Sequence, residues 1–74
     1  SAINNITYTI MEKQAVTLTV KNIMGEVVAL LLNNEVQDIG CYKVTYDASW
    51  LSHGVYFYTL QTATGNETKK MVKE

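Results

Sequence analysis

The stretch from residue 51 to residue 60 constrains the fold of this chain more than any other part of the sequence. It begins with a turn signal, Ser-His-Gly, and continues as Val-Tyr-Phe-Tyr-Thr-Leu, the richest run of β-branched and aromatic residues in the chain. Such a run predicts a strand. Its apolar residues fall on both faces of that strand, with Val55 and Phe57 on one and Tyr56 and Tyr58 on the other. Because both faces need cover, we expect this strand to be central in a sheet.

The spacing of Leu51, Gly54 and Tyr56 resembles the tyrosine corner of Greek-key sandwiches. In that motif, a tyrosine at the start of a strand donates its hydroxyl to the backbone a few residues upstream. The alternative is that Tyr56 is a core aromatic residue whose hydroxyl reaches water. Both interpretations give these residues a role in the scaffold.

Most of the remaining chain alternates between apolar and polar residues, as half-buried strands do. The pattern covers residues 5–11, residues 15–21 and residues 41–47. Residues 22–25, Asn-Ile-Met-Gly, suit a type I turn that leads into a glycine with positive φ. We therefore expect a hairpin between residues 15–21 and the strand that follows the turn.

The stretch at residues 26–32 suits a buried helix or a strand, and its length and the turn before it favour a strand. Residues 33–40 are polar and turn-prone, so we expect the longest loop there, crossing between sheets. Residues 67–73 form a charged last strand, whose lysines indicate an edge guarded against stray pairing. With turns about every ten residues, the chain is predicted to be all-β, a single small Ig-like or Greek-key β-sandwich of six to seven antiparallel strands over residues 1–74.

Length and composition exclude several classes of function. The 74 residues include one cysteine and one histidine, so no internal disulfide forms and soft zinc ligands are too few. A net charge of −1 without a basic block leaves no electrostatic footprint for nucleic acid. The longest apolar run, residues 27–32, is far shorter than the ~20 residues of a membrane span. We expect no metal, no cofactor and no nucleic-acid partner.

Catalytic chemistry has little support in the sequence. Cys41 and His53 are the one possible thiol–imidazole pair, and neither lies in a known nucleophile setting. A buried thiol within a strand and a turn histidine explain them better. Asp38 and Asp47 could in principle act as a carboxylate pair, but both fall at loop edges, where Asp stabilises turns. We therefore expect no catalytic residues, no small-molecule substrate and no enzymatic activity.

From residue 6 to residue 73, the order of these signals resembles the type A C-terminal sorting domain of proteins exported by the type IX (Por) secretion system of Bacteroidetes-type bacteria. The most specific blocks of that family are Leu-x-x-Gly-Val-Tyr-Phe-Tyr-x-Leu, here residues 51–60, and a final Thr-Lys-Lys-Met-Val, here residues 68–72. The turn at Gly25 and the glycine before an alternating strand, Gly40, also match the family.

The chain departs from the family pattern at several positions. Met11 stands where the family has a proline, Lys21 where it prefers tyrosine, and Tyr46 where it prefers tryptophan. The sequence ends Val-Lys-Glu, without the further apolar residue and the closing basic residue that are common in the family.

The resemblance implies a secretion signal that forms the C-terminal domain of a longer exported protein. Its partners would be an N-terminal passenger, the outer-membrane translocon and a sortase-like surface peptidase. It would be in the periplasm during transit and then at the cell surface or outside the cell. The residues expected to carry recognition are Lys69, Lys70, Met71, Val72 and Lys73, and the scaffold residues are Gly25, Gly40, Leu51, Gly54 and Tyr56. The alternative for the lysines is a solvated, protective edge.

Two other classes of module share this type of fold. One is an Ig-like accessory module of a secreted hydrolase, which binds carbohydrate or spaces domains; an exposed aromatic strip that includes Trp50 would favour it. The other is the Ig-like segment of a flagellar hook-capping protein, in which the ending Lys-Lys-Met-Val is not expected. Fold analogy alone does not separate these modules.

Overall fold

A computed structural model of the chain describes residues 3–74. These residues form six strands and no helix, as the alternating patterns predict. The strands are β1 (Ile3–Ile10), β2 (Gln14–Asn22), β3 (Val27–Gln37), β4 (Gly40–Asp47), β5 (Gly54–Thr62) and β6 (Gly65–Lys73). The described residues contain no helical segment with the length and apolar character needed to cross a membrane.

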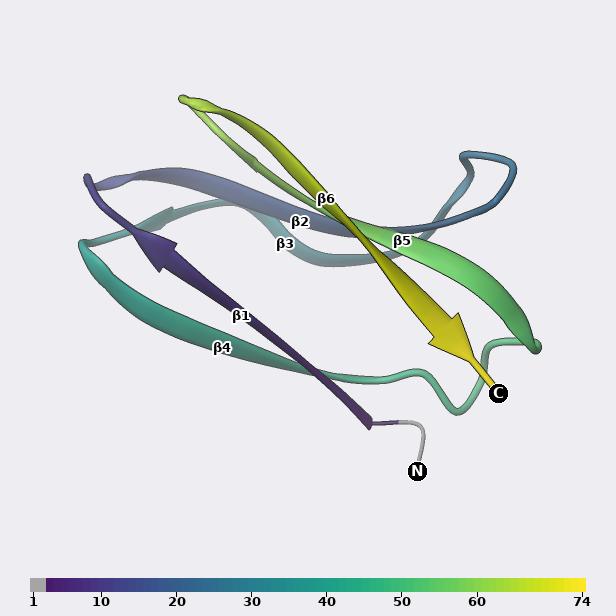
Figure 1. Ribbon diagram of the computed structural model, residues 1–74. Helices are drawn as coiled ribbons and strands as arrows, with labels where there is room; N and C mark the ends of the chain where they lie inside the picture. Colours follow the sequence, from purple (N-terminus) through teal and green to yellow (C-terminus); the bar gives the residue numbers. More distant parts are fainter. Residues whose placement is uncertain (1–2) are drawn as a thin grey trace.

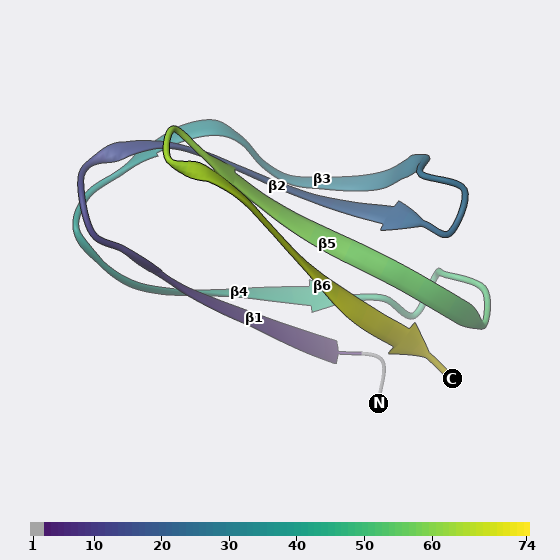
Figure 2. The same cartoon turned by 45° about the horizontal axis from the view of Figure 1, so that its top comes forward.

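The six strands pack as two layers, which confirms the predicted β-sandwich (Figure 1 and Figure 2). One sheet has four strands in the order β3-β2-β5-β6, and the other pairs β1 with β4. Every pairing is antiparallel. β5 lies between β2 and β6, so the strand with two apolar faces is central, as predicted.

The core lies between the two sheets. Val16, Leu18 and Val20 of β2 are completely buried and alternate with outward-facing polar residues, while Ile6 and Ile10 of β1 are buried on the opposite sheet. Full burial of an aliphatic side chain of this size stabilises the fold by about 1.5–3 kcal/mol. One cluster of core side chains joins the corner before β5 to the strands around it: Val20, Tyr46, Ala48, Leu51, Tyr56 and Met71.

The turn between β2 and β3 has the predicted form. The Gly25 N–H donates to the Asn22 carbonyl and the Asn22 N–H to the Glu26 carbonyl, both at 3.0 Å. Gly25 has a φ of 83°, a region that disfavours residues with a Cβ. The Asn22 side chain secures the turn, because its Oδ1 accepts the N–H groups of Met24 and Glu26 at 2.9 and 3.0 Å. The predicted hairpin is confirmed.

β3 corrects one prediction. Residues 33–40 are not the longest loop, because the strand continues to Gln37 and two residues separate it from β4. β2 supplies backbone partners along this polar run, and extra residues are accommodated by register shifts in the pairing. At one shift Asn34 adopts a φ of 52° and donates its N–H to Thr17 Oγ1 at 3.0 Å. The loop prediction was wrong because β2 extends back to Gln14 and pairs with β3 as far as Gln37, and this pairing overrides a polar composition.

Candidate recognition surface

β6 is the outermost strand of the four-stranded sheet, as its lysines predict. It pairs with β5 along its whole length, from Gly54 opposite Lys73 to Thr62 opposite Gly65, and no described strand lies on its other side. The backbone N–H and C=O groups along that side are therefore open to another strand. Residues 65–70 of β6 are all exposed.

The five residues predicted to carry recognition are neighbours on β6 but do not share a face. Met71 is 5% exposed and belongs to the core, so Lys69 and Lys73 lie on its inner side of the strand. Lys70 and Val72 lie on the outer face, where Val72 is 55% exposed. In the folded domain the accessible members are therefore the three lysines and Val72.

Two of the three lysines have a carboxylate in their neighbourhood. Lys69 Nζ lies 3.6 Å from Glu67 Oε1 in an exposed pair, which contributes little to stability. The pKa of Asp47 is held below its ordinary value of 3.8, mainly by hydrogen bonds from Ser49 and to a smaller extent by the charge of Lys73. The carboxylates on this side of the domain therefore neutralise part of the positive charge of β6.

Of the two interpretations of Tyr56 that the sequence left open, the corner before β5 has the hydrogen bond of a tyrosine corner. The Tyr56 hydroxyl donates to the Ser52 carbonyl at 2.9 Å, and the Tyr56 side chain is buried. Leu51 is buried beside it, and its N–H donates to the Ala48 carbonyl at 3.0 Å. Gly54 starts β5 with a φ of 148°. This corner sets the position at which β5, and with it β6, enters the sheet.

The two other scaffold glycines lie away from this corner. Gly25 closes the β2–β3 turn, and Gly40 starts β4 opposite Ile10 of β1. The expected scaffold residues therefore lie at three separate places: the β2–β3 turn, the start of β4 and the corner before β5.

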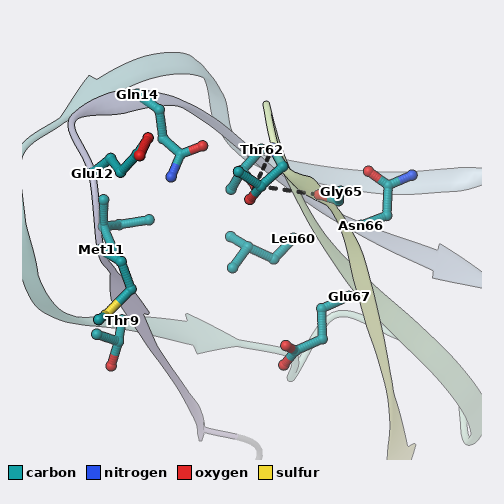
Figure 3. Close-up of a pocket in the computed structure, with 11 residues that line it drawn as sticks. Thr9, Met11, Glu12, Gln14, Leu60, Thr62, Gly65, Asn66 and Glu67 are labelled. Atoms are coloured by element: carbon teal, nitrogen blue, oxygen red, sulfur yellow. Dashed lines mark hydrogen bonds between the residues drawn. The ribbon is translucent and has the colours of Figure 1, made fainter.

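An open groove of about 440 Å³ lies between the β1–β2 turn and the β5–β6 hairpin (Figure 3). Thr9, Met11 and Glu12 line one side, and Leu60 and Glu67 line the other. Its lining contains no Cys, His or Lys, so it offers no thiol–imidazole or lysine chemistry. Within residues 3–74, no group of three or more His, Cys, Asp and Glu side chains is placed to hold a metal ion.

The structure does not bring Cys41 and His53 together. Cys41 lies near the start of β4, while His53 lies beyond the end of that strand. The predicted burial of the thiol is wrong, because Cys41 is exposed, with its Sγ 3.8 Å from Thr9 Oγ1. Side chains alternate along a strand, and Tyr46 and its same-face neighbours occupy the inner side of β4.

Trp50 lies in the corner between β4 and β5 and is 61% exposed. Its ring stands edge-on to buried Tyr46, with the ring centroids 6.4 Å apart. Every other aromatic side chain in residues 3–74 is buried or half-buried. The described part of the chain therefore has no exposed aromatic strip of the kind expected for a carbohydrate-binding accessory module.

These features define a class of protein: a small β-sandwich module with an open, lysine-bearing strand edge. A family model described as the secretion system C-terminal sorting domain matches residues 2–74, and the chain belongs to this family. It is therefore a sorting signal for type IX secretion, and it acts with the secretion machinery in export to the cell surface or the extracellular space. The family is one of sorting signal domains and not of catalytic domains. No curated protein and no solved structure matches the chain.

Proposed function

We propose that the outer-membrane translocon of the type IX system binds the free edge of β6. The observation that carries this proposal is that β6 pairs on one side only and keeps its lysines and Val72 accessible. A partner strand would form main-chain hydrogen bonds with the edge, while its side chains would contact Lys69, Lys70 and Lys73. Met71 would contribute by anchoring the strand in the core.

In the same proposal, residues 1–74 form one domain at the C-terminal end of a longer exported protein. An N-terminal passenger crosses the periplasm with it, and a sortase-like surface peptidase then removes the domain. The core supports folding before export, because it consists of apolar side chains and requires no disulfide.

An export assay tests the role of the edge. A signal peptide and a passenger that fluoresces in the periplasm are fused ahead of residues 1–74 in a type IX-competent bacterium. We expect the passenger at the surface with the wild-type domain and in the periplasm when Lys70 and Lys73 are both replaced by Glu. The matched variant carries Lys13→Glu and Lys43→Glu, which reverse two exposed charges outside β6. Equal export by the two folded double variants would refute the proposal.

A further inference from the structure

One row of side chains crosses the outer face of the four-stranded sheet on all four strands. Directly opposite pairs join Val27 to Lys21, Lys21 to Phe57, and Phe57 to Lys70. The row lies on the outer face because Val20, which precedes Lys21, is completely buried on the inner face. Apolar, cationic, aromatic and cationic side chains therefore follow one another from β3 to β6.

Strand pairing places two lysines, Lys21 and Lys70, on the outer face of this sheet and no Asp or Glu. The next row is formed by Leu30, Thr19, Thr59 and Thr68, all uncharged. Glu35 and Glu67 lie opposite Val16 and Leu60, on the inner side. The other carboxylates lie in turns or at the ends of strands: Glu12, Glu26, Asp38, Asp47 and Glu74. No carboxylate therefore lies directly opposite Lys21 or Lys70 in the strand pairing, although the net charge of the chain is −1.

Protection of a sheet edge does not account for this row. Lysines that prevent stray pairing belong on edge strands. Lys21 and Phe57 lie instead on β2 and β5, each of which has a strand on both sides. Phe57 is half-buried on the solvent side of its strand, so part of its apolar surface is left available for another contact.

We propose that this row docks an acidic segment of a partner protein in the export machinery, an inference that rests on the proposed function. Lys21 and Lys70 flank Phe57 at a separation of two strand spacings, about 10 Å. A partner segment with two carboxylates at that separation and an apolar side chain between them is complementary to the row. Val27 and Val72, 56% and 55% exposed, extend the apolar contact.

Two other occupants fit less well. An anionic membrane surface gains about 1 kcal/mol for each nearby lysine, so Lys21 and Lys70 together would supply only about 2 kcal/mol. A second copy of the chain stacked with its row directly over this row would place lysines opposite lysines, and like charges brought together across an interface are strongly unfavourable. An acidic protein segment brings no like charge to the face, and it can hold two carboxylates at fixed positions on either side of an apolar side chain that contacts Phe57.

Variants outside β6 test this inference in the export assay. We expect Lys21→Glu and Phe57→Ser to lower the amount of passenger at the surface about tenfold, and Lys21→Arg to preserve it. Lys43→Glu, an exposed charge reversal on the other sheet, is the matched control and is expected to export normally. Thermal melting checks that each variant is folded. If Lys21→Glu is unfolded, Lys21→Gln replaces it as a milder change.

The outcomes separate the two proposals. If the β6 double variant is retained in the periplasm while folded Lys21 variants export normally, the docking row is overturned and the proposed function stands. If the β6 double variant and the folded Lys21 variants all export normally, the docking row and the proposed function are both refuted. Sedimentation with phosphatidylglycerol vesicles supplies the second measurement. Vesicle binding that Lys21→Glu abolishes would overturn a protein partner, whereas loss of export without vesicle binding supports it.

Discussion

Tyr56 of β5 and Met71 of β6 lie directly opposite each other, and both side chains are buried, at 8% and 5% exposure. Tyr56 also closes the corner before β5 through its hydrogen bond to Ser52. This one pair therefore joins the scaffold of the domain to the strand that presents its lysines. Stability and the proposed recognition are separable in experiments, because the buried contacts and the exposed lysines use different side chains of the same strand.

Replacing Tyr56 by Phe removes the donor to the Ser52 carbonyl and leaves the ring in place. We expect the free energy of unfolding to fall by about 1–3 kcal/mol, because a partly buried carbonyl loses its partner. Urea unfolding measures the change.

The control for this substitution is Tyr46→Phe. Tyr46 is as buried as Tyr56, but its hydroxyl has no hydrogen-bond partner among the described residues. Burial raises the pKa of Tyr46 above 10.0, as expected for a hydroxyl withdrawn from water. Because an unpaired buried hydroxyl is unfavourable, Tyr46→Phe is expected to leave stability unchanged or to raise it. Equal losses for the two variants would contradict this account.

Met71 and Val72 are adjacent on β6 but face opposite sides, and their truncation separates core packing from surface contact. Met71→Ala is expected to lower the free energy of unfolding by about 2–5 kcal/mol, because it leaves a cavity in the core. Val72→Ala is expected to change it by less than about 0.5 kcal/mol. Chemical unfolding of both variants is the measurement, and a larger loss for Val72 would show that the strand is rotated relative to this structure.

The β2–β3 turn makes a prediction about backbone strain alone. A Cβ at Gly25 would meet no atom within 4 Å, so the cost of Gly25→Ala comes from the φ of 83° and not from a clash. We expect a loss of about 1–2 kcal/mol for Ala and a smaller loss for Asn, which adopts this conformation more readily. Thermal unfolding would distinguish them, and equal stability of the Ala and Asn variants would argue against strain.

The hydrogen bonds to Asp47 are expected to make the stability of the fold slightly sensitive to acid. Its Oδ1 accepts the Ser49 N–H at 2.9 Å, and the hydrogen bonds from Ser49 hold its pKa below 3.8 in the folded chain. Since the folded pKa is the lower one, the stabilisation is present above pH 3.8 and is lost as the pH falls through the folded value. Asp47→Asn should therefore lose less stability than the wild type over that interval, as measured by melting at a series of pH values. Parallel curves would count against this role.

Interactions within a few residues were predictable from the sequence. The turn ending at Gly25 depends on Asn22, three positions earlier, and the Tyr56 corner depends on a carbonyl four positions earlier. Alternation also indicated which strands have one apolar face. The exposure of Cys41 was open to the same reasoning, because Tyr42 and Tyr46 alternate with it and claim the inner face of β4.

By itself, the sequence determined the all-β class, the hairpin at Gly25 and the family of this chain, and it left the tyrosine corner as one of two interpretations. Only the tertiary structure decided that β3 continues through its polar run and that Lys21, Phe57 and Lys70 stand in one row. The physical reason is that pairing between distant strands depends on their register, and a shift of one residue moves every side chain to the other face. A local pattern records which residues can form a strand but not which distant residue will lie opposite each of them.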